Sequence, residues 1–273
     1  MRLARQHRGF TLIELVMVIV ILGIVGAMVA VFMRAPIDAY FDTARRAALT
    51  DVADTALRRM GRDIRKALPN SVRNPSPNCI EFLPTRTGAR YRVEDSTPGD
   101  GTALAFGVAD DRFNMLGRNT DLPADQQIRA NDIVVVYNLG IPGANAYAGD
   151  NSQPVSAVVD GAETRITLSA PKAFPLSSPG ARFHVIPGDE TIVSYVCSGG
   201  RLYRQTNYPY ATSCPAPVPG ATPVLAEGVL ACNFIYSGSD LQRNALVQLT
   251  LQLGNAAGES VSLYHTVHVN NTP

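Results

Sequence analysis

The longest uninterrupted run of apolar residues lies near the start of the chain, at Thr11–Met33, where Glu14 is the only charged side chain. As an α-helix, this run would extend roughly 35 Å, which is enough to cross the hydrocarbon core of a bilayer. A carboxylate within a membrane costs on the order of 2.5 to 3.5 kcal/mol on insertion scales, so Glu14 is a candidate functional residue. A plain signal anchor, the simplest alternative, gives no reason for that acid.

A helical pattern continues beyond this run and becomes amphipathic. Pro36 interrupts the apolar residues, and we expect it to kink one long helix rather than end it. Apolar residues then recur every three to four positions until Pro69 closes the pattern, which predicts a single stripe against which a globular head packs. The stripe comprises Ile37, Phe41, Ala44, Ala48, Val52, Ala56, Met60, Ile64 and Ala67. Opposite charges four residues apart indicate solvated faces elsewhere on the helix, at Asp42 and Arg46, Asp54 and Arg58, and Arg59 and Asp63.

After Pro69 the pattern changes to short apolar or alternating runs separated by turn residues, which predicts β-strands. The expected strands are Ile80–Leu83, Arg90–Val93, Ile133–Tyr137, Arg165–Leu168, Ala181–Ile186, Ile192–Cys197, Arg201–Gln205, Cys232–Tyr236, Leu246–Leu253 and Val261–Val269. Two connections are typical of hairpins, at Ser198-Gly199-Gly200 and at Gly254–Ser260. The head is therefore expected to be one antiparallel β-rich domain of roughly 200 residues.

Three segments between these strands are rich in Gly, Pro, Asn and Asp and are expected to be surface loops: 94–131, 138–156 and 206–224. Four aspartates crowd the first segment and its surroundings, at Asp95, Asp100, Asp110 and Asp111. Oxygen-rich loops can hold calcium, although this spacing does not match an EF-hand. Polar turns are the simpler interpretation of these residues.

Charge is nearly balanced over the chain, with 24 Lys and Arg against 23 Asp and Glu. Such a balance does not provide the wide basic field that nucleic-acid binding needs. The first nine residues nevertheless carry Arg2, Arg5 and Arg8 without an acid. By the positive-inside rule, this asymmetry predicts a cytoplasmic N-terminus and an exported C-terminal part.

Cysteines number four and all follow the apolar segment. None forms a C-x-x-C pair, so a zinc or thioredoxin-like site is not expected. We expect the four cysteines to form disulfides in an oxidising compartment instead. Four cysteines permit three connectivities. We hypothesise that Cys197 pairs with Cys214, closing the segment after the predicted 192–205 hairpin, and that Cys79 pairs with Cys232.

Catalytic signatures are absent from the sequence, which contains no G-x-S-x-G, P-loop or H-E-x-x-H motif. His265 and His268 lie three apart in an expected strand and so point to opposite faces, which argues against a shared metal. His184 stands in an apolar strand and is expected to be a structural histidine. The sequence therefore predicts neither an enzyme nor a cofactor or metal site.

At the start of the apolar run stands Arg8-Gly9-Phe10-Thr11-Leu12-Ile13-Glu14-Leu15, a stretch that resembles the prepilin cleavage motif of type IV pilins and type II secretion pseudopilins. The resemblance implies that a membrane aspartyl peptidase cuts after Gly9 and N-methylates the new first residue, Phe10. Glu14 then lies four residues after the new amine, on the same helix face. In the family this carboxylate pairs with the N-terminal amine of a neighbouring subunit, so two buried charges offset each other only in the correct axial register.

The resemblance implies an α+β, type IV pilin-like fold, with a long transmembrane and amphipathic helix packed on an antiparallel β-rich head. It divides the chain into a leader (1–9), a transmembrane helix (10–35), an amphipathic continuation (36–68) and a head (69–273). The implied location is the bacterial inner membrane, with a periplasmic head, and then the filament at the cell surface. The implied partners are the prepilin peptidase, other major and minor pilins, the inner-membrane assembly platform and the lipid bilayer.

Three further stretches are similar to minor pilins of the mannose-sensitive haemagglutinin pilus: 64–73 with 79–82, 193–197 with 202–204, and 264–271. This resemblance implies a role in priming assembly or at the filament tip. The segment 94–190 carries no such motif. Minor pseudopilins of the J type and PilW-type minor pilins share the same layout and stay open as alternatives. A tip adhesin that binds through its long loops, and a membrane-tethered periplasmic enzyme, are alternatives of other classes.

Overall fold

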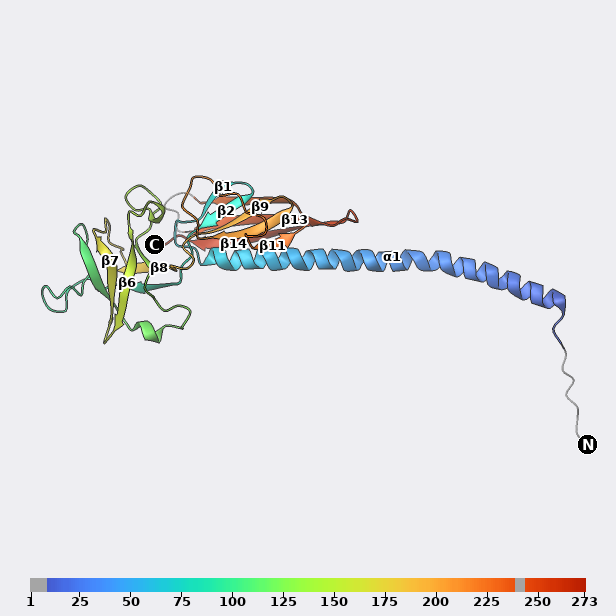
Figure 1. Ribbon diagram of the computed structural model, residues 1–273, viewed down its shortest axis with the longest axis horizontal. Helices are drawn as coiled ribbons and strands as arrows, with labels where there is room; N and C mark the ends of the chain where they lie inside the picture. Colours follow the sequence, from blue (N-terminus) through green and yellow to red (C-terminus); the bar gives the residue numbers. More distant parts are fainter. Residues whose placement is uncertain (1–8, 239–243) are drawn as a thin grey trace, which may run out of the picture. The chain divides into compact units, whose positions relative to one another are not determined.

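The computed structural model describes residues 9–238 and 244–273, in two units that divide between Ala48 and Leu49. One helix, α1 (Leu12–Arg65), contains Pro36 and continues through it (Figure 1). The expectation of a single long helix is therefore confirmed, and the kink at Pro36 stays a prediction. The helix ends before the expected residue 68, because the N–H groups of Lys66 and Ala67 bond to carbonyls three residues back, which tightens the last turn.

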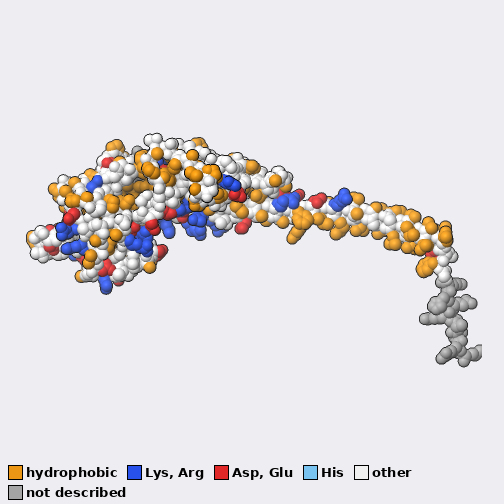
Figure 2. Space-filling view, in the orientation of Figure 1, with side chains coloured by type: hydrophobic (Ala, Val, Ile, Leu, Met, Phe, Trp, Pro, Cys, Tyr) orange, Lys and Arg blue, Asp and Glu red, His pale blue; other side chains and the backbone are white. Residues whose placement is uncertain are grey.

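The N-terminal half of the helix presents apolar side chains on all sides, and they cover most of its surface in Figure 2. Its most apolar 18-residue window has a mean hydropathy of 3.1, and none of that window is buried. By length and composition, α1 can cross a membrane. Apolar surface of this extent is unfavourable in water, so this part of the chain needs lipid or other helices around it.

The C-terminal part of the helix packs into the first core of the head. This core lies among α1, a five-stranded antiparallel sheet in the order β1-β2-β9-β10-β11, and a three-stranded sheet in the order β12-β13-β14. The strands are β1 (Arg73–Ser76), β2 (Cys79–Phe82), β9 (Val193–Ser198), β10 (Arg201–Thr206), β11 (Val224–Glu227), β12 (Val229–Ser237), β13 (Asn244–Gly254) and β14 (Ser260–Asn270). Both expected hairpins are confirmed, since β9 pairs with β10 and β13 with β14.

The expected helix stripe is confirmed at Ala56, Met60, Ile64 and Ala67, which are buried, whereas Val52 is 43% exposed. Gly61 also lies on the buried face, although the apolar pattern did not indicate it. A Cβ added to Gly61 would lie 3.0 Å from Nε2 of His265 on β14. The glycine thus permits a close approach of helix and sheet.

A second core fills a separate lobe that is inserted between β2 and β9, two strands that pair directly with each other. Its six-stranded antiparallel sheet has the order β3-β8-β5-β6-β7-β4. The strands are β3 (Thr87–Arg90), β4 (Asp110–Met115), β5 (Ile133–Val136), β6 (Ser152–Asp160), β7 (Thr164–Lys172) and β8 (Arg182–Ile186), with short 3-10 turns η1 (Asn119–Asp121) and η2 (Ala146–Ala148). Strands β6, β7 and β8 mark this lobe in Figure 1.

The six-stranded sheet closes on itself. Directly after β3, Arg92 N donates to Asn114 O on β4, and Leu116 N donates to Arg90 O, both at 2.9 Å. A bridge joins Tyr91 to Met115 between these bonds. The first and last strands are thereby joined, and the apolar side chains of the second core fill the interior of a small barrel.

Side-chain amides tie this barrel to the first core. The Asn70 side chain donates to the backbone carbonyls of Asn138 and Asn271, and the Asn138 side chain donates to Pro69 O at 2.7 Å. Asn138 follows β5 of the barrel, while Asn271 follows β14 of the first core. Residues 49–273 accordingly form one compact unit, whose described residues contain two large apolar cores and a smaller buried cluster of Leu68, Leu83, Val135, Ile186 and Ile192.

Some sequence expectations for the head were wrong. The strand expected at Arg90–Val93 is instead β3 at Thr87–Arg90, followed by the residues that close the barrel. The segments 94–131 and 138–156, expected to be loops, contain β4 and the start of β6. β1 and β11 were also missed. In β4 only Phe113 and Met115 are buried, so local hydrophobicity is too weak to predict a strand that its barrel partners stabilise.

Candidate functional site

The segment expected to be processed begins the described part of the chain. Gly9, Phe10 and Thr11 precede the helix, and the Phe10 side chain is 81% exposed. Thr11 caps the helix, since its Oγ1 accepts from Glu14 N at 3.3 Å and its carbonyl accepts from Leu15 N at 3.1 Å. Arg2, Arg5 and Arg8 of the expected leader lie outside the described residues.

Glu14 occupies the third helical position after the Thr11 cap, so the pair has the T-x-x-E spacing of a capping box. A carboxylate in the first turn is also favoured by the positive end of the helix dipole. The Glu14 side chain is exposed within the otherwise apolar run of residues 11–33. This arrangement leaves the carboxylate available to a partner outside the chain. The cleavage after Gly9, the methylation of Phe10 and the pairing of Glu14 stay predictions.

Two disulfides are present, and the connectivity that we hypothesised is wrong. Cys79 pairs with Cys214 and Cys197 pairs with Cys232, with Cα separations of 6.6 and 6.5 Å. The reason is the side-chain alternation of strands: Cys79 lies opposite Val196 in the β2–β9 register, so the neighbouring Cys197 points to the other face of the sheet. Cys197 therefore meets Cys232 in the first core, while Cys79 meets the segment 207–223 on the outer face.

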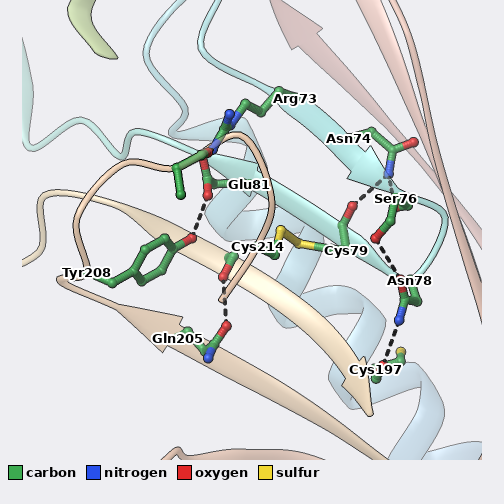
Figure 3. Close-up of a disulfide and its surroundings, with 12 residues drawn as sticks. Arg73, Asn74, Ser76, Asn78, Cys79, Glu81, Cys197, Gln205, Tyr208 and Cys214 are labelled. Atoms are coloured by element: carbon green, nitrogen blue, oxygen red, sulfur yellow. Dashed lines mark hydrogen bonds and ion pairs between the residues drawn. A yellow bond between two sulfur atoms is a disulfide. The ribbon is translucent and has the colours of Figure 1, made fainter. Parts of the chain in front are cut away.

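An ion pair lies on that same outer face, beside the Cys79–Cys214 disulfide (Figure 3). The Glu81 side chain is fully buried and pairs with Arg73, whose side chain is 21% exposed. Tyr208 donates to Glu81 Oε2 at 2.8 Å. Burial, together with the Glu81 charge, raises the pKa of the Tyr208 phenol, which keeps its proton for this bond.

Arg73 also holds the segment 207–223 in place. Its guanidinium lies 4.9 Å from the ring centroid of Tyr147 and 4.3 Å from that of Tyr210, and it donates to Ala211 O. These contacts connect β1 to two segments distant in sequence. They fix the covering segment to the sheet together with the disulfide.

A second polar cluster lies where the end of α1 meets the sheet. Asp63 Oδ2 accepts from the Tyr195 hydroxyl at 2.6 Å and from Arg204 Nε at 3.0 Å, so the expected pairing of Asp63 with Arg59 was wrong. The expected pair of Asp54 and Arg58 is confirmed, and Asp42 pairs with Arg45. Burial, and then the Asp63 charge, raises the pKa of Tyr195. The cluster anchors the helix to β9 and β10.

The aspartates considered as calcium ligands hold the backbone of their own loop. Asp95 accepts from the N–H groups of Gly99, Thr102 and Ala103, and Asp100 accepts from Thr97 N and from the Thr102 hydroxyl. Among the residues that the structure describes, no three His, Cys, Asp or Glu side chains gather as a metal site would require. Polar turns account for the geometry of these residues.

The histidines His184, His265 and His268 lie at separate places in the fold. On β14, His265 faces helix α1 at Gly61, whereas His268 is exposed on the opposite face, as the alternation predicted. His184 on β8 is half-buried. Burial, and then the charge of Arg182, lowers the pKa of His184 to about 4, so its ring is neutral at neutral pH.

A family model of the prokaryotic N-terminal methylation motif matches residues 4–30. Neither the curated proteins nor the solved structures contain a significant match to the chain. The matched residues comprise most of the expected leader and much of the apolar helix, and they support a type IV pilin-like precursor. The motif implies processing by a prepilin peptidase and assembly with other pilins, fits membrane anchoring, and points to a structural protein rather than an enzyme.

Proposed function

We propose that the mature chain, beginning at Phe10, is a minor pilin that primes assembly of a type IV pilus or lies at its tip. The observation that carries this proposal is the match to the methylation motif at the start of an exposed apolar helix, in which Glu14 is the only acid between residues 11 and 33. A helix of this kind is stable in a membrane or among similar helices. Glu14 would set the axial register of the helix by pairing with the N-terminal amine of a neighbouring subunit.

The pilus we propose is of the mannose-sensitive haemagglutinin type, and the resembling protein is its biogenesis protein MshO. Two of the stretches that carry this resemblance meet in the head, where Asn70 N donates to Asn271 Oδ1 at 3.1 Å. The inserted barrel makes the head large, and a large head is more readily accommodated in a few copies than in every layer of a filament.

Processing is tested by intact-mass and N-terminal analysis of the protein from membranes with and without the prepilin peptidase of the host. We expect a chain that begins at methylated Phe10 only when the peptidase is present. An uncut chain in both membranes, or a cut after residue 30, would indicate an ordinary anchor or signal and would remove the main support for an assembly role.

The role of Glu14 is tested by Glu14→Gln, which removes the charge and keeps the side-chain length. We expect the variant to be cleaved normally and to reach the membrane, but to be lost from sheared filaments. Asp54→Asn is the matched control, because Asp54 is paired with Arg58 at the helix surface in the head unit. Equal incorporation of both variants would contradict the register role.

A tip adhesin is a second candidate, and the inserted barrel is the observation that favours it. The barrel lies between two directly paired strands, so it can be removed while β2 and β9 keep their register. We therefore suggest replacing residues 84–190 by a short Gly-Ser linker. Loss of filaments would favour assembly, whereas intact filaments that no longer adhere would favour adhesion.

A minor pseudopilin of the J type is distinguished by a different phenotype. Deletion of the gene would then abolish secretion of a type II substrate and leave the pili unchanged. If the chain is a PilW-type minor pilin, deletion of the gene would instead abolish a pilus other than the mannose-sensitive haemagglutinin type.

A further inference from the structure

Two arginines stand side by side on the outside of the barrel. In the antiparallel register of β3 and β8, Arg90 lies directly opposite Arg182, and Gly88 lies opposite His184. Because side chains alternate along strands, these four residues share one face. Both arginines are exposed, and neither guanidinium group has a hydrogen bond or an ion pair with another residue in 9–238 or 244–273.

Two other arginines of the barrel are, in contrast, paired with acids. Arg92 binds Glu163, and Arg112 binds Asp111 at 2.8 Å. Arginine is always charged, and like charges directly opposite each other destabilise a pair of strands. The Arg90–Arg182 pair therefore opposes folding of the sheet unless an anion lies between the two guanidinium groups.

The surface around the pair is hollowed. A cavity of about 280 Å³ is lined by Gly88, Ala89, Arg90, Arg182, Phe183 and His184. Gly88 leaves the surface of the strand open beside the His184 ring, whose Cδ2 would lie 3.4 Å from an added Cβ. The ring is neutral, so it adds no repulsion and still has one N–H to donate.

We infer that Arg90 and Arg182, with His184 beside them, form a binding site for an oxoanion: sulfate, phosphate or carboxylate. The guanidinium fork matches the oxygens of these groups and binds them through charge-assisted hydrogen bonds. The cavity is at the lower limit of ligand-pocket volumes, which suits a single anionic group, either free or carried on a polymer. This inference does not depend on the proposed role in pilus assembly.

The test uses the full mature chain in neutral detergent. Binding of inorganic sulfate and of acetate is measured by calorimetry, and the melting temperature is compared in sodium sulfate and in sodium chloride of equal ionic strength. The double variant Arg90→Thr/Arg182→Thr is compared with the matched control Arg112→Thr/Arg201→Thr, which removes the same charge from two other exposed strand positions.

We expect the unmodified chain and the control to bind an oxoanion, and the double variant to bind at least tenfold more weakly. The sulfate-specific rise in melting temperature should disappear only in the double variant. Without sulfate and at low ionic strength, the double variant should melt at a higher temperature than the unmodified chain, because the repulsion is removed. A lower melting temperature would give the arginines a structural role and would overturn the site.

A third variant, Gly88→Leu, keeps both charges and occupies the hollow. The backbone at Gly88 is ordinary strand, and a Cβ there meets only normal contacts, so the fold should be retained. We expect weaker sulfate binding with an unchanged melting temperature in chloride. Competition by heparin for the sulfate site would identify a polymer-borne group as a ligand, and no competition would restrict the site to small anions. Equal sulfate binding in all variants would overturn the inference.

Discussion

The ion pair of Arg73 and Glu81 allows a quantitative test of how the head holds its outer face together. The two partners differ in burial: the Glu81 side chain is completely buried, while Arg73 retains 21% exposure. Removing Arg73 should therefore lower the unfolding free energy by more than removing Glu81 does. Arg73→Met leaves a fully buried carboxylate that keeps the Tyr208 hydroxyl as a partner but has lost its counter-charge, which should cost about 3 to 5 kcal/mol.

The opposite substitution, Glu81→Gln, should cost less, about 1 kcal/mol. The amide oxygen of a glutamine can still accept from Tyr208, and the Arg73 guanidinium can reach water while it keeps its contacts with the Tyr147 and Tyr210 rings. In the double variant Arg73→Met/Glu81→Gln, the unpaired buried charge is absent. The double variant should then be more stable than Arg73→Met alone by about 2 kcal/mol or more.

The assay is guanidinium-induced unfolding of the oxidised protein, followed by circular dichroism in detergent, with the four variants of the double-mutant cycle. Arg201→Met is the control, because Arg201 forms an exposed pair with Glu227 and should change the unfolding free energy by less than about 1 kcal/mol. Equal losses for Arg73→Met and Glu81→Gln, or losses that add in the double variant, would refute the reasoning from burial.

Three further predictions concern other parts of the head. Gly61→Ala should be more favourable in a His265→Ala background than in the unmodified chain, by up to about 1 kcal/mol, because the ring no longer meets the added methyl group; a double-mutant cycle of unfolding free energies measures this. The pKa of His184 is about 4 in the folded chain and 6.5 ordinarily, so the unfolding free energy should fall by ~3 kcal/mol as the pH drops from 6.5 to 4. In His184→Gln, this decrease should be absent from the measured pH dependence of the unfolding free energy. Hydrogen bonds, first that from Thr164, lower the pKa of Asp160 from 3.8 to about 2, so Asp160→Asn should melt at a lower temperature at pH 7, and the difference should vanish as the pH approaches 2.

The elements whose patterns are local could be predicted from the sequence. The long helix and nine of the ten expected strands, the barrel strand β5 among them, follow from periodicity within a few residues. The β9–β10 hairpin follows from Gly199 and Gly200, both of which adopt positive φ in a two-residue turn. The motif at Gly9, Phe10 and Glu14 is equally local, and the family model matches it.

The disulfide connectivity, the closure of the barrel and the pairing of Asp63 depended on tertiary structure. Which face Cys197 presents depends on the register of β2 and β9, whose residues are separated by the entire barrel. The juxtaposition of Arg90 and Arg182 likewise comes from a strand pairing across about ninety residues. A sequence pattern shows which residues a strand will bury, because alternation is a property of the strand itself. It does not show which strand lies beside it, because register results from the packing of the whole core.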